Sequence, residues 1–190
     1  EEQFSSGFYF APNIGDTLRL ISPGGNLLAE KVISHIELFS EIPSGVVINE
    51  INFQSSDEFD TGDWIELFTL QRNIDLSGWK LTDSDPTHVF TFPLETNLPP
   101  NSFLVIARDP DNFNMIVSDT TNVIGGFDFG FARESDDVKI YDELGKVVDW
   151  VSYSSSDPWP DIEKRGGTFE LLNPRFANYS SENWHVSGHE

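Results

Sequence analysis

The chain has 190 residues, with 11 Lys and Arg against 32 Asp and Glu, and its formal net charge at pH 7 is −21. Nucleic acids and anionic membranes bind clustered positive charge, so this balance argues against both as direct partners. Hydrophobic residues make up 38% of the chain and aromatic residues 13%, with 16 Phe and 5 Trp, which is enough apolar material for a folded core. The composition therefore predicts an acidic globular protein.

Short runs of β-branched and aromatic residues recur along the chain, and clusters of Gly, Pro, Asn and Asp separate them. Several runs alternate at period two, so that Val138 and Ile140 share one face of their strand. This spacing predicts an all-β sandwich or barrel. The predicted strands are Thr17–Ser22, Asn26–Val32, Val46–Phe53, Trp64–Leu70, Gly78–Thr82, His88–Phe92, Ser102–Arg108, Asp137–Tyr141, Lys146–Tyr153 and Thr168–Leu172.

Two segments have the composition of hairpin turns, because each supplies a glycine where positive φ is needed: Pro23-Gly24-Gly25-Asn26 and Asp142-Glu143-Leu144-Gly145. Residues 109–131 are the least strand-like part of the chain. They are predicted to form a long loop with one helical turn near Phe113–Val117.

Residues 7–28 resemble residues 126–148, with identities at Gly7/Gly126, Phe8/Phe127, Phe10/Phe129, Asp16/Asp136 and Gly25/Gly145. One interpretation is that any two β-hairpins look alike. The other is that residues 1–44 are the end of a preceding copy of the same module. A hairpin of that kind has unpaired edges, and in that case we expect it to pack on the main domain or on a neighbouring chain.

Residues 46–187 contain a series of sequence blocks in a fixed order. They are Val46-Val47-Ile48-Asn49-Glu50-Ile51, Gly62-Asp63-Trp64-Ile65-Glu66-Leu67-Phe68, Ile74-Asp75-Leu76-Ser77-Gly78-Trp79-Lys80-Leu81-Thr82-Asp83, Asp136-Asp137-Val138-Lys139-Ile140, Gly145-Lys146-Val147-Val148-Asp149-Trp150-Val151 and a final Trp184. Together they resemble the lamin-tail domain family, with Thr69 standing where that family usually has Asn. The resemblance implies an immunoglobulin-like β-sandwich over residues 45–188, preceded by an N-terminal hairpin segment over residues 1–44.

The chain contains neither a heptad rod nor a basic nuclear-localisation cluster, so the resemblance is to the bacterial exported branch of the family. That branch implies a non-catalytic interaction or anchoring module of a larger secreted, periplasmic or cell-surface protein. Its expected partners are a protein or cell-surface polymer and the other domains of the same chain. The absence of cysteine agrees with export. Glu1-Glu2-Gln3-Phe4 does not resemble a signal peptide, so we expect that signal to have been removed or to lie outside these residues. No stretch approaches the apolar length of a membrane span, and we expect no membrane insertion.

Catalysis has weak support in the sequence. The four histidines show no metal-ligand spacing, and no Gly-x-Ser-x-Gly motif is present. Glu50 and Glu66 each lie within an apolar run, on strands that are candidates for neighbours. A glycosidase uses such a pair, so a hydrolase is the third and most distant alternative. Buried acids more often bind backbone or side-chain donors and fix the sheet.

Ligand binding has two candidate positions, and both belong to the second alternative, an adhesive module that binds Ca²⁺ or carbohydrate. Asp57, Glu58, Asp60 and Asp63 crowd a short polar loop, and oxygen ligands of this density suit Ca²⁺, although solvated surface acids explain them equally well. Otherwise no cofactor is expected. Trp159 lies in a Pro-bounded loop and is a candidate platform for a sugar ring, or else a plug at one end of the sandwich. Trp64, Trp79 and Trp150 lie in predicted strands and are expected in the core.

Overall fold

The computed structural model describes residues 17–32, 45–55, 59–70, 72–117, 122–162 and 167–188. The chain forms two compact units, Glu1–Leu38 and Phe39–Glu190. The first unit contains β1 (Thr17–Ile21) and β2 (Leu27–Val32). The second contains β3 (Val47–Asn52), β4 (Trp64–Thr69), β5 (Ile74–Asp75), β6 (Lys80–Thr82), β7 (Val89–Thr91), β8 (Asn97–Leu98), β9 (Ser102–Ala107), α1 (Pro110–Ile116), β10 (Val123–Gly125), β11 (Ser135–Tyr141), β12 (Val147–Ser154), β13 (Thr168–Leu171), the 3₁₀ turn η1 (Ser181–Asn183) and β14 (Trp184–Ser187).

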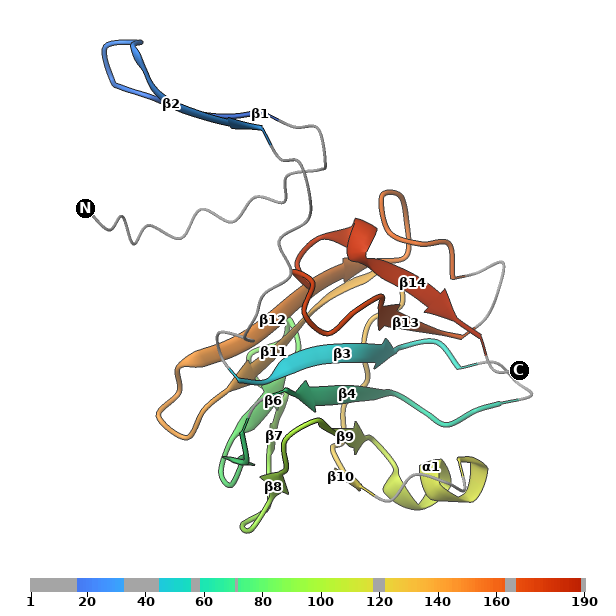
Figure 1. The fold of residues 1–190 in the computed structure, drawn as a ribbon. Helices are drawn as coiled ribbons and strands as arrows, with labels where there is room; N and C mark the ends of the chain where they lie inside the picture. Colours follow the sequence, from blue (N-terminus) through green and yellow to red (C-terminus); the bar gives the residue numbers. More distant parts are fainter. Residues whose placement is uncertain are drawn as a thin grey trace. The chain divides into compact units, whose positions relative to one another are not determined.

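The strands of the second unit form two main sheets, which pack as the layers of a sandwich (Figure 1). The larger sheet has the order β10-β9-β4-β3-β13-β14, and the smaller has the order β12-β11-β6-β7. β10 runs parallel to β9, whereas the other pairs in these sheets are antiparallel. β5 and β8 form a separate short pair. The prediction of an all-β, immunoglobulin-like sandwich with an additional N-terminal hairpin is confirmed.

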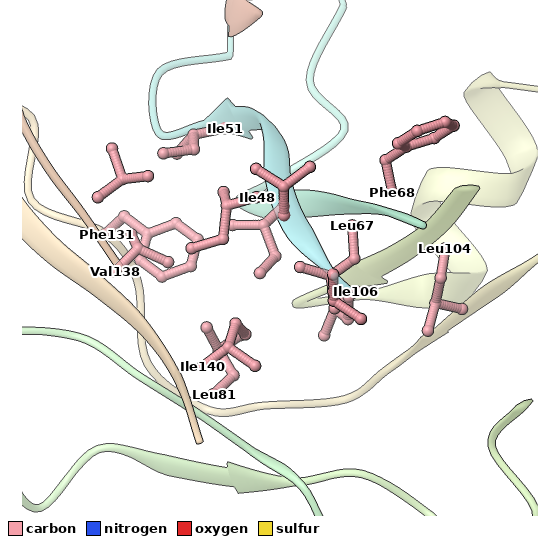
Figure 2. Close-up of a cluster of buried hydrophobic side chains, with 14 of the residues drawn as sticks. Ile48, Ile51, Leu67, Phe68, Leu81, Leu104, Ile106, Phe131, Val138 and Ile140 are labelled. Atoms are coloured by element: carbon pink, nitrogen blue, oxygen red, sulfur yellow. The ribbon is translucent and has the colours of Figure 1, made fainter. Parts of the chain in front are cut away.

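Alternating residues from the two sheets fill the space between them (Figure 2). The larger sheet contributes aliphatic side chains from β3, β4 and β9, and the smaller sheet contributes others from β6 and β11. Each of these side chains is at most 1% exposed; they are Ile48, Ile51, Leu67, Leu104, Ile106, Leu81, Val138 and Ile140. Period-two alternation in both sheets thus produces one continuous core.

Aromatic rings fill the core where the ends of β3 and β12 approach each other. Phe53, directly after β3, stacks on Tyr153 of β12 with ring centroids 4.3 Å apart. Phe53 also contacts Phe169 of β13 edge to face at 5.0 Å. The Tyr153 hydroxyl donates a hydrogen bond to the carbonyl oxygen of Ala132 at 2.7 Å, which satisfies the polar end of this buried ring.

The ten strands predicted from the sequence are present, with ends within two residues of the predicted positions. The helical turn predicted near Phe113–Val117 is part of α1, where the Asp109 side chain caps the helix by accepting a hydrogen bond from the Asn112 backbone N–H at 3.0 Å. β5, β8, β10 and β14 were not predicted. Each has two to four residues, which is too short for a periodic pattern.

Thr69, the departure from the family pattern, is fully buried at the end of β4. Its hydroxyl donates to the carbonyl oxygen of Gly45 at 2.6 Å, which ties the end of β4 to the segment that enters β3. The substitution therefore keeps a polar group at this turn. In the part of the chain that the structure describes, no helix has the length and apolarity needed to cross a membrane.

The two leucines Leu81 and Leu144 provide a matched test of the core. Leu81 has no exposed surface, whereas Leu144 in the β11–β12 turn is 85% exposed. Leu81→Ala should lower the free energy of unfolding by about 2–5 kcal/mol, because it removes buried methyl groups and leaves a cavity. Leu144→Ala should change it by less than about 0.5 kcal/mol. Urea unfolding measures both, and equal losses in the two variants would contradict the core described here.

Candidate functional site

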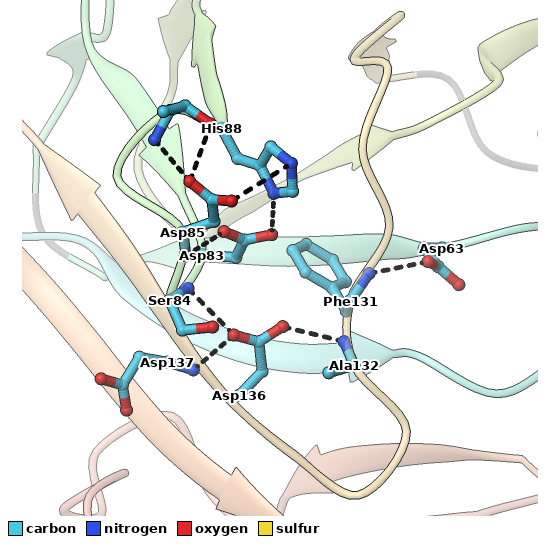
Figure 3. Close-up of polar contacts among 10 residues, drawn as sticks. Asp63, Asp83, Ser84, Asp85, His88, Phe131, Ala132, Asp136 and Asp137 are labelled. Atoms are coloured by element: carbon cyan, nitrogen blue, oxygen red, sulfur yellow. Dashed lines mark hydrogen bonds and ion pairs between the residues drawn. The ribbon is translucent and has the colours of Figure 1, made fainter.

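Buried and half-buried aspartates in the second unit hold loops together (Figure 3). Asp136, which is 6% exposed, accepts hydrogen bonds from the backbone N–H groups of Ser84 at 2.9 Å, Ala132 at 2.8 Å and Asp137 at 2.8 Å. It thereby joins the turn after β6 to the loop before β11. These donors replace the water that a buried carboxylate loses.

Asp83 makes a second set of such contacts next to Asp136 (Figure 3). One carboxylate oxygen accepts from the Asp85 backbone N–H at 2.7 Å, and the other lies 2.7 Å from His88 Nδ1. The hydrogen bond with Asp83 raises the pKa of His88 above its ordinary value. The His88 ring stacks on Phe129 with centroids 5.0 Å apart and an interplanar angle of 6°. Asp83 and His88 thus fix the turn between β6 and β7 on the core.

Two of the four residues proposed for Ca²⁺ lie outside the described residues, namely Asp57 and Glu58. The other two have partners within the protein. Asp60 accepts from the Gly62 backbone N–H at 3.1 Å, and Asp63 accepts from the Phe131 backbone N–H at 2.8 Å. Within the described ranges, no three His, Asp or Glu side chains converge as a metal site does. Ca²⁺ binding by this loop stays a prediction.

Trp159, the proposed sugar platform, is half-buried between β12 and β13. Its ring stacks on Phe169 with centroids 5.3 Å apart, and it also contacts Trp184 at 5.7 Å. Both of those rings belong to the core. The contacts of Trp159 are those of a side chain that closes one end of the sandwich.

Glu50 and Glu66, the proposed catalytic pair, are directly opposite each other on β3 and β4. Glu170 of β13 pairs with Glu50 on its other side, and His185 of β14 pairs with Glu170. Four titratable side chains therefore form a row across the larger sheet. Glu50 accepts a hydrogen bond from the Thr168 hydroxyl, and Glu66 accepts one from Asn49 Nδ2 at 2.9 Å.

Burial disfavours the charged forms of this row. The pKa of Glu50 is raised to about 8, mainly by desolvation and also by the neighbouring carboxyls Glu66 and Glu170, against the hydrogen bond from Thr168. Desolvation also raises the pKa of Glu66 to about 7. At the β14 end of the row, His185 Nε2 lies 3.4 Å from a carboxylate oxygen of Glu170. At neutral pH Glu50 therefore retains a proton that exposed glutamates release, and Glu66 retains one in part.

The outer face of the smaller sheet has a different character. Core residues of β11 and β12 alternate with residues that point to solvent, and strand register aligns these outward residues in rows. Trp150 of β12 is opposite Lys139 of β11, which is opposite Thr82 of β6. Tyr141 of β11 is opposite Lys80 of β6. We call these five residues the Trp150 face.

Trp150 is 44% exposed, and its neighbours hold it in place. Asp137 lies two positions before Lys139 on the same side of β11. Burial tends to raise the pKa of Asp137, but the nearby side chains of Ser152, Lys139 and Trp150 lower it below its ordinary value. Lys139 Nζ lies 3.1 Å from Asp137 Oδ2 and 6.0 Å from the centroid of the Trp150 ring, within the range of a cation–π interaction. An exposed aromatic ring is thus fixed on the sheet surface before any ligand binds.

A groove of about 360 Å³ lies on this side of the sheet, and four residues of the Trp150 face line it, namely Lys80, Thr82, Lys139 and Tyr141, but not Trp150 itself. The turn after β6 contributes Asp83, Ser84 and Pro86, and the β11–β12 turn contributes Gly145. Lys80 and Lys139 place two cations on this surface, with Asp137 beside Lys139. An exposed ring with polar groups around it has the chemistry of a binding surface.

The prediction that Trp150 lies in the core was wrong, although Trp64 and Trp79 are buried as expected, at 5% and 6% exposed. Val151 and Tyr153 of the same strand are buried, and Trp150 is out of phase with them. Period-two alternation placed Trp150 on the outer face. The position of a residue in the strand's alternation, more than its hydrophobicity, decides which way it faces.

The row of glutamates makes stability depend on pH. Because the folded state holds a proton on Glu50 that the unfolded chain releases above its ordinary pKa of 4.5, the contribution of Glu50 to stability is complete below that value. It is lost as the pH rises towards about 8, and Glu66 and Asp149, whose pKa is raised to about 6 by burial, act in the same direction.

Between pH 5 and pH 9 we expect a loss of at least about 2 kcal/mol in the free energy of unfolding, since one pKa unit corresponds to about 1.4 kcal/mol. Glu50→Gln should flatten the profile, and Glu143→Gln in the exposed β11–β12 turn should not. Urea unfolding at several pH values measures this. Stability that increases over this range in the wild-type protein would contradict the burial of the row.

Comparison with known proteins identifies the family of this domain. No curated protein sequence matches the chain. The family model of the lamin tail domain matches residues 40–155, which is more than half of the chain and runs from the segment before β3 to the end of β12. This range contains the row of glutamates on β3 and β4 and the whole Trp150 face. The chain therefore belongs to the lamin tail domain family, a family of non-catalytic immunoglobulin-like domains.

Proposed function

We propose that the chain is a non-catalytic interaction or anchoring module of a larger exported bacterial protein, and that it binds its partner through the Trp150 face. The observation that carries this proposal is Trp150 itself, a large ring that is 44% exposed and held by Asp137 and Lys139. Exposed aromatic residues in fixed positions dominate the energy of many protein interfaces. The expected partner is a protein or a cell-surface polymer.

The hydrogen bonds of the acidic residues support a role without catalysis. Asp63 and Asp136 accept hydrogen bonds from backbone N–H groups of loops. Asp149 accepts one from the backbone N–H of Ile48 and one from the side-chain amide of Asn178. Glu50 and Glu66 are bonded to residues of their own sheet. These carboxylates stabilise the fold through their hydrogen bonds. Membership of a family of non-catalytic domains also argues against catalysis.

Export and a cell-surface location have compositional support. The chain contains no cysteine, and a net charge of −21 favours solubility and disfavours nucleic acids as partners.

Retention on the cell surface tests the anchoring function. A fluorescent protein fused to residues 1–190 should remain on washed cells of the organism that encodes the chain, and Trp150→Ala should reduce retention at least tenfold, since it removes the central contact. Met115→Ala is the matched control, because Met115 is 76% exposed on α1, away from the smaller sheet. Retention that is equal in wild type and Trp150→Ala would exclude the Trp150 face, and no retention of wild type would exclude anchoring.

Carbohydrate binding is the second candidate function, and the position of Trp150 favours it over binding at Trp159. A sugar ring presents an apolar face to an aromatic ring and hydroxyl groups to the polar residues around it. Lys139 and Asp137 beside Trp150 supply a donor and an acceptor for such hydroxyls. The overall charge of −21 repels polyanions, so the ligand class that fits is a neutral glycan.

Titration with defined oligosaccharides tests this candidate. One of the neutral hexasaccharides of glucose, mannose or N-acetylglucosamine should shift the indole N–H resonance of Trp150, and hexagalacturonate should not. Trp150→Ala should abolish the binding heat in calorimetry while leaving the protein folded, since the ring lies on the outer face of the sheet and not in the core. Cell-surface retention without any response to neutral glycans would reject the carbohydrate candidate and leave a protein partner.

A further inference from the structure

The hairpin of the first unit has the same register as a hairpin of the second. In β1 and β2 the pairs include Leu18 with Lys31 and Leu20 with Ala29, followed by a shift in register between Leu20 and Ile21. In β11 and β12, 120 positions later, the pairs Val138 with Val151 and Ile140 with Asp149 are followed by a shift between Ile140 and Tyr141. The irregularity therefore lies at the same place in both hairpins.

The turns of the two hairpins also have the same hydrogen bonds. Gly25 N–H donates to the Ser22 carbonyl at 2.9 Å, and Gly145 N–H donates to the Asp142 carbonyl at 3.0 Å. Ser22 and Asp142 each accept a further hydrogen bond through their side chains, from the N–H groups of Asn26 at 3.1 Å and Lys146 at 2.8 Å.

The glycines complete the match. Their φ angles are +82° for Gly25 and +80° for Gly145, a region that favours glycine. Two unrelated hairpins share a turn type often, but a shared turn together with a bulge at the same position is more specific. The structure thus extends the sequence similarity of residues 7–28 and 126–148 to the backbone.

In the second unit this hairpin is completed by another strand. β11 pairs with β6 on the side away from β12, with Lys139 opposite Thr82 and Tyr141 opposite Lys80. Val148, on the β12 side, packs against the core of the sandwich. The hairpin is therefore one edge of a four-stranded sheet with a core beneath it.

In the described part of the first unit, the equivalent strand edge and the equivalent of Val148 are exposed. Among the described residues, no strand other than β2 pairs with β1. Leu28 is 62% exposed, whereas its equivalent Val148 is half-buried against the core of the sandwich. A two-stranded sheet with exposed apolar residues is marginally stable by itself and presents an unpaired edge.

The end of the family match fits this hairpin as the end of a module. The match ends at residue 155, directly after the last residue of β12. In the first unit, residues 33–46 lead from the end of β2 to the start of β3. In the second unit the sandwich continues after β12 with β13 and β14, which pair with each other and with β3. A preceding module that ends at β2 would be followed at once by β3 of the next module, and it would lack counterparts of β13 and β14.

We propose that β1 and β2 are the closing hairpin of a preceding lamin tail domain, and that the edge of β1 pairs with a β6-type strand of that domain. The occupant is the segment of the natural protein that precedes Glu1. The two hairpins differ at the position of Trp150, the residue at the centre of the proposed binding face. Glu30 stands at the position of Trp150, and Arg19, at the position of Lys139, forms an ion pair with Glu30 at 2.7 Å. The preceding domain thus keeps the cross-strand pair and lacks the aromatic ring.

The natural full-length protein provides the test. With an offset of 120 residues, a block similar to Gly78-Trp79-Lys80-Leu81 should lie about 40 residues before Glu1. In the full-length protein, hydrogen exchange of the β1 amides should be at least tenfold slower than in the 190-residue chain, because the β6-type strand protects them. The amides of β11 are the control and should exchange at the same rate in both proteins.

Three results would overturn the proposal. Upstream sequence without the block would do so, whatever the exchange rates. Equal exchange of β1 in the two proteins would show that the upstream segment leaves this edge unpaired. Protection of β1 that rises with the concentration of the 190-residue chain would identify a second copy as the occupant instead. None of these results bears on the Trp150 face, which lies in the second unit.

Discussion

The two layers of the sandwich are joined by a carboxylate that accepts hydrogen bonds from the opposite sheet. Asp149 lies on β12 of the smaller sheet, and its Oδ2 accepts the backbone N–H of Ile48 on β3 of the larger sheet at 2.6 Å. The same oxygen accepts Asn178 Nδ2 at 2.7 Å, which adds the segment between β13 and β14. Ile48 immediately precedes the register shift of β3 against β4. Asp149 therefore determines where β12, β3 and the C-terminal segment meet, and the positions of Trp150 and Glu50 follow from it.

The physical requirement behind this arrangement applies to the other buried acids as well. A carboxylate that leaves water needs donors, and a chain with 11 Lys and Arg for 32 Asp and Glu cannot supply them with cations alone. Backbone N–H groups of turns and loops take that role at Asp63, Asp83 and Asp136. Burial still raises the pKa of Asp63 and Asp149, and it raises the pKa of Glu50 and Glu66 furthest, to about 8 and about 7. The acidic composition is thus compatible with a well-packed core.

Strand positions and fold class were predictable because period two and turn composition are local signals. Side-chain roles were predictable only where the partner is also local. Asp63 was assigned to a metal loop, but its hydrogen-bond donor is the N–H of Phe131, 68 residues away, which no local pattern indicates. Trp159 contacts Phe169 and Trp184, and those contacts arise only when the sandwich closes. The neighbours Glu50 and Glu66 were proposed as a pair from their apolar surroundings, and the β3–β4 register brings them together.

The β1–β2 and β11–β12 hairpins have the same backbone register but present different side chains to solvent. Residues that fix the hairpin point inward or lie in the turn, and they include the glycines Gly25 and Gly145 and the side-chain acceptors Ser22 and Asp142. The outward position opposite Arg19 or Lys139 carries no such constraint, because the hairpin forms with Glu30 there in the first unit and with Trp150 there in the second. In the first hairpin, an Arg–Glu ion pair at this position is solvent-exposed and contributes little to stability. In the second, a lysine and an aspartate hold an indole ring in a fixed orientation. A change at one outward position thus alters the surface that a partner meets while the hydrogen bonds of the hairpin remain the same.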